Sequence, residues 1–407
     1  KNLKNSTIIV ISSAIKKNNL ELKLAKKNKL PIYKRGDMLA NIVSLKKNIV
    51  VAGSHGKTTT TSLISSILHE SKFDATVING GVINQFQNSA KLGKSEWSVL
   101  ESDESDGSFL KIPTTYSVLT NIDKEHLDFY KSFSNLIKSF EKFLEKTPPF
   151  GKSFICIDEI NNQKLIKKIN TKNYQTYGFN KNANFHIILK KKNNKFSKFD
   201  LKIKLFGKKN RIYKNFQIPL LGEHNIQNAT AAIAITLALG INIAHIKKSL
   251  KNFKGVQRRY IKVFSYNKND FYDDYAHHPT EINAVLKSVK SVNKNRKIIS
   301  IFQPHRYSRL KLLKNEFSKS FKLADEVVLC PVYSAGEKID PKFNNSTFGK
   351  LIVKNSKVRL IIINSENDLF NYFRQNLIKD ELIICMGAGS ISSWIKSISQ
   401  NEYFRKS

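Results

Sequence analysis

The chain has 407 residues, which is enough for two or three domains that each bury their own core. Its 69 Lys+Arg against 32 Asp+Glu give a formal net charge of +37, a value that first suggests a nucleic-acid partner. The lysines are spread through the whole chain and mixed with asparagine, as in residues 190–209. This pattern fits a general Lys/Asn bias better than a local binding stripe, so we expect no nucleic-acid partner.

The cysteines and the apolar runs narrow the class further. Cys156, Cys330 and Cys385 lie far apart without paired spacing, which indicates neither a disulfide framework nor a zinc site and suits a reducing cytoplasm. No apolar run approaches the roughly 18–20 residues of a membrane span. Because the chain opens at Lys1 on a strand-like run, we expect further residues upstream in the whole protein.

Strand-like and helix-like segments alternate from the beginning of the chain. Residues 7–43 predict strand, helix, short strand and helix, which is typical of the closing part of an α/β unit. The pattern restarts near residue 45 with the buried strand "NIVVAG", followed by a polar loop and a helix. A long amphipathic helix is predicted over 133–146, stopped by the prolines that follow it.

The second half of the chain changes character twice. Residues 180–220 alternate apolar and polar side chains, which predicts a small antiparallel excursion of three strands. After residue 253, apolar strands separated by helices predict a parallel, doubly wound sheet, in which ligands bind at the carboxyl ends of the strands. We therefore place domains at 1–44, 45–252 and 253–407.

The stretch "VAGSHGKTTTT" (51–61) looks like a phosphate-binding loop. Gly53 and Gly56 free the backbone to direct amide groups at phosphate oxygens, Lys57 would bridge phosphates, and Thr58 has the place of the hydroxyl that binds Mg²⁺. The usual pattern has a glycine where Val51 stands, so the loop is short by that standard. The buried strand before it and the helix after it favour a nucleotide site over a turn with a solvated lysine.

Polar side chains follow the next two strands as well. Glu101, Asp103, Glu104 and Asp106 come after "WSVL", where a carboxylate could meet a phosphate-bound metal, although a solvated acidic turn explains them nearly as well. After "YSVL" come Asn121, Asp123 and His126, and a lone histidine is more often structural than a ligand. Three consecutive strand ends with phosphate or metal chemistry strengthen the functional interpretation of each.

The third unit carries a cationic set of residues at its strand ends. Paired histidines in "DDYAHHPTE" (273–281) and two arginines in "QPHRYSR" (303–309) follow neighbouring strands, and "QRR" (257–259) adds further cations. Arginine offers a planar fork of donors, so this edge suits a carboxylate or a phosphate. The alternative is that Arg309 only faces solvent from the following helix.

Together these stretches resemble the Mur ligases of peptidoglycan synthesis. The matching motifs occur in the family's order: "GSHGKTTTT", "ESDESDGSF", "TNIDKEHLDFY", "LLGEHNIQNATAA", "GVQRRY", "DDYAHHPTEI", "QPHRYSR" and "GAGSIS". The resemblance implies an α/β fold of three domains: a remnant of a Rossmann-like N-terminal domain, a central ATPase domain with a phosphate loop and a parallel sheet, and a Rossmann-like C-terminal domain. The family uses the shorter loop, which accounts for Val51.

The resemblance also implies roles for individual residues. Lys57 would act in catalysis on the ATP phosphates, Mg²⁺ would be held by Thr58, Glu101 and His126, and Tyr275, His277, Arg306 and Arg309 would bind the reacting carboxylate, the alanine and the transferred phosphate, the last three also being catalytic. The residues that would bind ATP are Gly53, Ser54, His55, Gly56, Lys57, Thr58, Thr59, Asn225 and Asn228. Asp103, Glu104 and His278 receive no separate step.

The implied reaction joins L-alanine to the lactyl carboxylate of UDP-N-acetylmuramate through an acyl phosphate, in cell-wall precursor synthesis that supports cell shape and division. We expect strand ends of two sheets to converge on one triphosphate, with domain closure excluding water. The family's glycine-rich opening of the first domain has no counterpart before Lys1. We therefore expect the chain to bind ATP and Mg²⁺ but UDP-N-acetylmuramate poorly.

Three alternatives stay open at this point. A recycling ligase joins a ready-made peptide to the same sugar nucleotide, although "NIDKEHLDFY" looks more like the alanine-adding branch. A basic nucleic-acid-binding protein with a nucleotide-binding core, or a catalytically dead relative, would each keep part of the pattern. We expect Lys57→Ala to abolish turnover without disturbing the fold, on the premise that Lys57 lies on a surface loop without core contacts.

Overall fold

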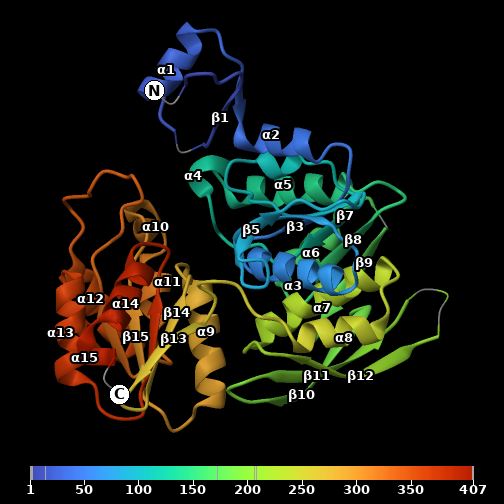
Figure 1. Ribbon diagram of the computed structural model, residues 1–407. Coiled ribbons are helices and arrows are strands. Elements are labelled where there is room, and N and C mark those ends of the chain that lie inside the picture. The colour runs from blue at the N-terminus through green and yellow to red at the C-terminus, as the bar shows by residue number, and fades with distance from the viewer. Residues whose placement is uncertain (1–2, 14, 172, 206, 208, 406–407) are drawn as a thin grey trace. The chain divides into compact units, whose positions relative to one another are not determined.

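The computed structural model describes residues 3–13, 15–171, 173–205, 207 and 209–405. These residues form two compact units (Figure 1). Unit 1 comprises Lys1–Lys191, Lys198–Pro219 and Asn225–Lys254, and unit 2 comprises Lys192–Ser197, Leu220–His224 and Gly255–Ser407. The proposed division into three domains at residues 44 and 252 stays a prediction.

The first elements of unit 1 follow the predicted order of strand, helix, strand and helix. They are β1 (Ile9–Ile11), α1 (Leu20–Lys27), β2 (Ile32–Lys34) and α2 (Arg35–Ile42). The two strands pair in parallel. Asn19 caps α1 by accepting a hydrogen bond from the Leu22 amide at 3.0 Å.

A ten-stranded sheet runs through the described part of unit 1, in the order β12-β11-β10-β9-β8-β7-β3-β6-β4-β5. Its strands are β3 (Lys47–Ala52), β4 (Thr76–Ile83), β5 (Asn88–Lys91), β6 (Trp97–Glu101), β7 (Tyr116–Leu119), β8 (Lys152–Cys156), β9 (Tyr174–Gly178), β10 (Phe185–Lys192), β11 (Ser197–Ile203) and β12 (Arg211–Ile218). Strand β3 pairs in parallel with both β6 and β7. The three strands that carry the predicted site motifs are therefore adjacent.

Helices cover both faces of this sheet. They are α3 (Lys57–Glu70), η1 (Ser108–Lys111), α4 (Leu127–Tyr130), α5 (Phe133–Glu145), α6 (Ile160–Ile166), α7 (Glu223–Ala238) and α8 (Ile243–Lys251). Figure 1 shows α5 and α3 on opposite faces. Leu136, Phe140 and Phe143 of α5 are buried in one cluster with Val50 and Leu119 of the sheet, so β3 and β7 are covered on both sides and need apolar runs.

The three strands predicted over residues 180–220 are present as β10, β11 and β12, and consecutive strands are neighbours in the sheet. They do not form a separate small sheet, because β10 continues the large sheet by pairing in parallel with β9. The excursion therefore extends the sheet of unit 1.

Unit 2 contains a second sheet of six strands among its described residues, in the order β13-β14-β18-β15-β16-β17. The strands are β13 (Ile261–Tyr266), β14 (Asn269–Asp274), β15 (Ile298–Phe302), β16 (Glu326–Leu329), β17 (Arg359–Ile362) and β18 (Leu382–Met386). All neighbouring pairs are parallel except β13 with β14. The prediction of a parallel sheet is confirmed, and the antiparallel edge strand is an addition to it.

Two apolar clusters show that the second sheet is doubly wound. Ile282, Phe317 and Phe348 pack on one face, and Leu369 and Ile395 pack on the other. The helices are α9 (Pro279–Val292), α10 (Tyr307–Leu312), α11 (Lys314–Lys319), α12 (Asn345–Ser356), α13 (Glu366–Asn376), α14 (Ile391–Gln400) and α15 (Glu402–Arg405). This arrangement places the ends of β14 and β15, with their histidines and arginines, at one edge of the sheet.

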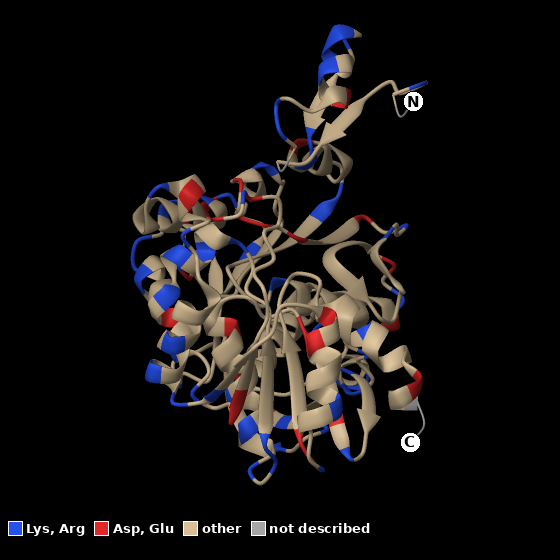
Figure 2. Ribbon diagram, turned by 90° about the vertical axis from the view of Figure 1, so that its left-hand side faces the viewer, with Lys and Arg blue, Asp and Glu red and all other residues tan. Residues whose placement is uncertain are grey.

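The structure shows where the basic residues and the cysteines lie. Figure 2 shows Lys and Arg on helices, strands and loops of both units. The three cysteines are buried and free. Among the residues that the structure describes, no helix combines the length and the apolar character needed to cross a bilayer.

Candidate active site

The predicted phosphate loop connects β3 to α3 in unit 1. Gly53 has φ 129° and Gly56 has φ 82°, conformations that glycine adopts without strain. A Cβ at Gly53 would lie 2.1 Å from Thr120 Oγ1, and one at Gly56 would lie 2.7 Å from Asn228 Oδ1. The two glycines are therefore needed both for backbone conformation and for close approach. The loop leads into the amino end of α3, where backbone amides favour an anion.

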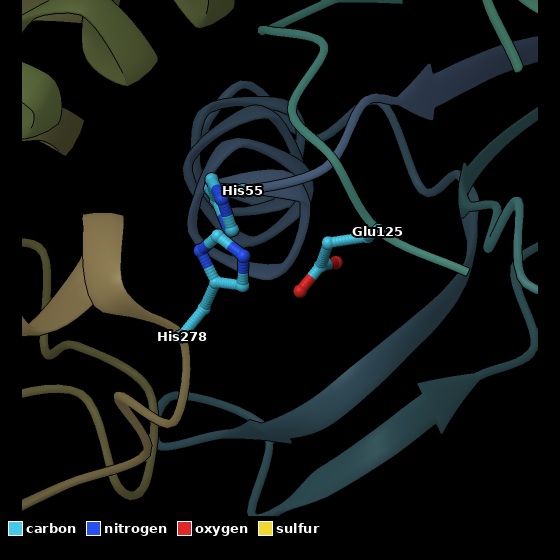
Figure 3. A group of neighbouring side chains, drawn as sticks. All are labelled: His55, Glu125 and His278. Atoms are coloured by element: carbon cyan, nitrogen blue, oxygen red, sulfur yellow. The ribbon is translucent and has the colours of Figure 1, made fainter. Parts of the chain in front are cut away.

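The segment after β7 holds this loop in place. The Ser54 amide donates to the Asn121 carbonyl at 3.0 Å, and the His55 amide donates to Asn121 Oδ1 at 2.8 Å. His55 Nε2 lies 3.1 Å from Asp123, and the Thr120 hydroxyl donates to the His55 carbonyl at 2.7 Å. Figure 3 shows His55 on the loop and a further residue of the segment, Glu125. Sequence reasoning placed Asn121 and Asp123 at the site but missed that they bind the loop itself.

Lys57 is paired with a buried carboxylate. Its Nζ lies 2.8 Å from Glu104 Oε2, and the Glu104 side chain has no exposed surface. Burial opposes the charged amine, but Glu104 and Asp103 raise the pKa of Lys57 above its usual value. Burial raises the pKa of Glu104, against the effect of Lys57. The expectation that Lys57 has no core contact is therefore wrong, because its partner belongs to the interior.

Carboxylates and a histidine surround the amino end of α3. The Thr58 hydroxyl donates to Glu101 Oε1 at 3.0 Å, and the Gly80 amide donates to Glu101 Oε2 at 2.7 Å. His126 groups with Asp103 and Glu104, whose ligand atoms lie within 4.8 Å of one another. The structure thus brings Thr58 and Glu101 into contact. It places His126 beside Asp103 and Glu104, the two acids to which the sequence analysis assigned no role in the reaction.

Oxygen donors of this kind fit Mg²⁺. Hard oxygen ligands are what the ion prefers, and Glu104 Oε1 is a buried atom without a hydrogen-bond partner among the described residues. Burial opposes ionisation of Asp103, yet Lys57 and His126 lower its pKa, so it is a carboxylate. A site with this many carboxylates accepts a triphosphate only when a cation offsets the repulsion.

The remaining residues predicted to bind ATP lie along the loop and α7. Thr59 is buried in the first turn of α3. Asn228, on α7, is the residue whose side chain stands against Gly56, and its Nδ2 donates to Asn225 Oδ1 at 3.3 Å. The structure therefore places the predicted asparagine pair together, with Asn228 next to the loop.

In unit 2, Tyr275 and His277 lie at the end of β14. Their rings meet edge to face with centroids 5.0 Å apart, and the guanidinium groups of Arg258 and Arg259 lie 4.8 and 5.3 Å from the Tyr275 centroid. His277 Nδ1 lies 2.9 Å from the Tyr275 carbonyl. Because a carbonyl only accepts, Nδ1 carries the proton and Nε2 of the neutral ring is an acceptor.

Arg306 and Arg309 follow β15, and His305 connects them to His277. The His305 and His277 ring centroids are 5.6 Å apart, and Arg309 donates to His305 Nδ1 at 3.2 Å. Arg306 has φ 69°, and its buried Nε has no hydrogen-bond partner among the described residues. A strained backbone and an unsatisfied guanidinium donor are features of an anion-binding position. The motif at residues 303–309 contains His305, but the contacts of His305 with His277 and Arg309 were not predicted from the sequence.

His277 and His305 are neutral near pH 7 because burial lowers the pKa of each ring. Burial, with Arg309 adding to it and Glu281 opposing it, lowers the pKa of His277 to about 3. Burial and the neighbouring arginines lower the pKa of His305 to about 4. These rings can accept hydrogen bonds at neutral pH without adding positive charge to the cluster.

His277 makes stability depend on pH. The unfolded ring takes up a proton below about pH 6.5, whereas the folded ring stays neutral to about pH 3. Its stabilising effect is therefore present above pH 6.5 and is lost as the pH falls, by at most about 1.4 kcal/mol per pH unit. We expect unfolding free energies between pH 7 and 5 to fall less steeply in His277→Gln than in the wild type. The control is exposed His245→Gln, which should keep the wild-type slope, and equal slopes in all three would contradict the assignment.

Two family models match the chain. The Mur ligase middle domain matches residues 51–236, and the Mur ligase glutamate ligase domain matches residues 258–389. With the phosphate loop in unit 1 and the cationic cluster in unit 2, these matches define the class: the chain belongs to the Mur ligase family.

Individual relatives narrow the resemblance further. The chain is 56% identical over 400 residues to the UDP-N-acetylmuramate–L-alanine ligase of Pelagibacter ubique (strain HTCC1062), covering 98% of this chain and 86% of that protein. The solved UDP-N-acetylmuramate-alanine ligase of Thermotoga maritima superimposes with a TM-score of 0.81 at 25% identity, covering 99% of this chain and 87% of that one. A murein peptide ligase of Psychrobacter arcticus 273-4 gives 0.70 at 20% identity, over 97% and 86%, and shows the shared fold alone.

Proposed function

We infer that this chain is an ATP-dependent ligase that joins L-alanine to the lactyl carboxylate of UDP-N-acetylmuramate, a step of peptidoglycan precursor synthesis. The observation that carries this inference is the 56% identity to a UDP-N-acetylmuramate–L-alanine ligase along 98% of the chain. The side chains of both units supply the chemistry that such a reaction needs.

In unit 1, ATP would bind at the loop of residues 53–59, with Asn225 and Asn228 near the adenine. Lys57 would contact the phosphates, and Thr58, Glu101 and His126 would hold Mg²⁺. When bound, the ion supplies positive charge that offsets the charge of the phosphate oxygens during transfer. Asn121 and Asp123 keep the loop amides in place through their contacts with Ser54 and His55.

In unit 2, Arg306 and Arg309 would bind the anionic groups of the reaction. The fork of a guanidinium matches a carboxylate or a phosphoryl group, and the unsatisfied Nε of Arg306 is available for one of them. Tyr275 would also bind substrate. Its ring is positioned by the His277 ring and by the guanidinium groups of Arg258 and Arg259. His277, with a pKa near 3, is too weak a base to take a proton efficiently, so its Nε2 would orient the alanine amine.

The reaction proceeds in two steps. The lactyl carboxylate attacks the γ-phosphorus of ATP, an oxygen–phosphorus bond forms, the bond to the ADP oxygen breaks, and an acyl phosphate results. The alanine amine then attacks the acyl carbon to give a tetrahedral intermediate. The bond from that carbon to the phosphate oxygen breaks, and the amine proton passes to the departing phosphate, which leaves the amide. Fixed cations position the migrating phosphoryl group and stabilise its negative charge, and this stabilisation is the main contribution of a protein to such catalysis.

The proposal also names surroundings and partners. UDP-N-acetylmuramate and L-alanine are the expected small-molecule partners, and the expected location is the cytoplasm, where these precursors and ATP occur. A nucleic-acid partner is not part of the proposal. The expectation of poor sugar-nucleotide binding by residues 1–407 stays a prediction.

Phosphate release from ATP tests the proposed function. We expect release by the full-length protein that requires UDP-N-acetylmuramate and L-alanine together, and glycine and L-serine are each tested in place of L-alanine. A murein tripeptide replaces alanine in a parallel reaction. Release with the tripeptide and none with L-alanine would contradict the proposal in favour of a recycling ligase.

A further inference from the structure

Lys57 uses all of its hydrogen-bonding capacity within the protein. Its Nζ donates to the Gly53 carbonyl at 2.6 Å, to Glu104 Oε2 at 2.8 Å and to the Ser54 carbonyl at 3.3 Å. An ammonium group has three donors and no more. To bind a phosphate oxygen, Lys57 must therefore give up or share at least one of these acceptors.

The backbone of Glu104 is fixed by two hydrogen bonds, and its side chain is buried. The Tyr130 hydroxyl donates to its carbonyl at 2.5 Å, and the Gly107 amide donates to the same carbonyl at 3.0 Å. The side chain has no exposed surface, and Lys57 is the cation in contact with it. Water cannot solvate this carboxylate, so its stability as an anion depends on Lys57.

A fixed carboxylate on the phosphate-binding lysine is chemically similar to the phosphate that the lysine would bind. Both are anions that accept a hydrogen bond from Nζ. They repel each other at close range, and the loss of a buried counter-ion is costly. Carboxylate and phosphate thus compete for the charge of Lys57.

We propose that Glu104 is an internal competitor of ATP, a positioning residue that holds Lys57 against the loop until a phosphate group replaces its carboxylate on Nζ. The inference rests on the proposed function, since it assumes that the loop binds ATP. It assigns a role to the residue for which neither the motif nor its spacing indicated one. The exchange keeps Lys57 paired throughout and makes ATP affinity weaker than the loop alone would allow.

Glu104→Gln tests the competition directly. Glutamine has the same shape and still offers Lys57 an oxygen, but it removes the negative charge. We expect Glu104→Gln to bind ATP with Mg²⁺ several-fold more tightly than the wild type, measured by calorimetry on the full chain without other substrates. Glu104→Asp keeps the charge one methylene further from Nζ, so its affinity should lie between the two.

A structural role alone would not tighten binding, because a disturbed loop binds ATP more weakly. Asp106→Asn is the matched control: it removes an acid of the same segment that caps the Ser108 amide at 3.0 Å, and its affinity should stay near the wild type. If Glu104→Gln fails to fold, Glu104→Asp carries the test and must still bind more tightly than the wild type.

The outcomes separate this inference from the proposed function. Wild-type binding of ATP with equal or weaker binding by both Glu104 variants would overturn the competition and leave the proposed function intact. A wild-type chain that bound no ATP would overturn the proposed function and the competition with it. The affinity order Glu104→Gln, Glu104→Asp, wild type, from tightest to weakest, is the expected result.

Discussion

Lys57→Ala is expected to lower turnover by at least about 10²–10³-fold and to destabilise the protein by about 3–5 kcal/mol. Turnover falls because a cation is removed from the phosphoryl group that migrates. Stability falls because Glu104, with no exposed surface, is left buried without its counter-ion. Phosphate-release kinetics measure the first effect, and denaturant unfolding monitored by circular dichroism measures the second.

The partly exposed pair of Lys91 and Asp74 supplies the matched control. Its ends are 2.9 Å apart, and the two side chains keep 30% and 41% of their surface exposed, against 12% and 0% for Lys57 and Glu104. Such pairs contribute about 0–1 kcal/mol, so Lys91→Ala should change stability little and leave turnover intact. Turnover close to the wild type in Lys57→Ala would refute the assignment of the loop. An unchanged unfolding free energy would refute the importance of the Lys57–Glu104 pair.

Arg306→Ala is expected to lower turnover by about 10²–10³-fold while leaving ATP affinity unchanged. The variant removes the guanidinium whose Nε is buried without a partner in the described part of the chain. Arg306 belongs to unit 2, whereas the phosphate loop belongs to unit 1. Arg306→Lys should restore little activity, since an ammonium lacks the planar fork of donors. Turnover kinetics measure the loss of activity, and calorimetry with ATP measures the unchanged affinity.

Arg374→Ala is the control within unit 2, because Arg374 is exposed in the last turn of α13. It should leave both turnover and ATP affinity as in the wild type. If Arg306→Ala weakened ATP binding as strongly as it lowered turnover, the assignment of Arg306 to the reacting carboxylate or phosphoryl group would be wrong.

The sequence predicted the two sheets well where their strands are buried on both faces. Strands β3, β15 and β18 consist mainly of buried apolar residues, and such strands between helices are typical of parallel sheets. The motifs at their carboxyl ends could be placed because chain order and strand direction fix that edge. The sequence therefore predicted which strand ends form the candidate site, but not the contacts among its side chains.

The sequence analysis did not predict strand β13, because β13 is recognised mainly by the hairpin turn that joins it to β14. Asn267 and Lys268 have φ 49° and 63°, the left-handed conformations of a tight hairpin, and only one of them is a residue that often adopts it. Without a glycine, the short polar interruption before β14 carries no typical hairpin signal. The antiparallel edge of the second sheet therefore became visible only in three dimensions.

The partner of Lys57 could not be read from the sequence either. Four acids stand within 101–106, and spacing does not tell which of them turns inward. The choice of Glu104 depends on Tyr130, which holds its backbone from α4, and on Gly107, which turns the chain with φ 71°. Contacts between segments that are distant in the chain decide the burial of a carboxylate, and local pattern does not contain them.

The fate of the lactyl carboxylate oxygen tests the central claim most directly. UDP-N-acetylmuramate carrying a heavy oxygen isotope in that carboxylate is incubated with the protein, ATP, Mg²⁺ and L-alanine, and the released phosphate is analysed by mass spectrometry. An acyl phosphate intermediate transfers one labelled oxygen to each phosphate released. Amide product accompanied by unlabelled phosphate would contradict the account.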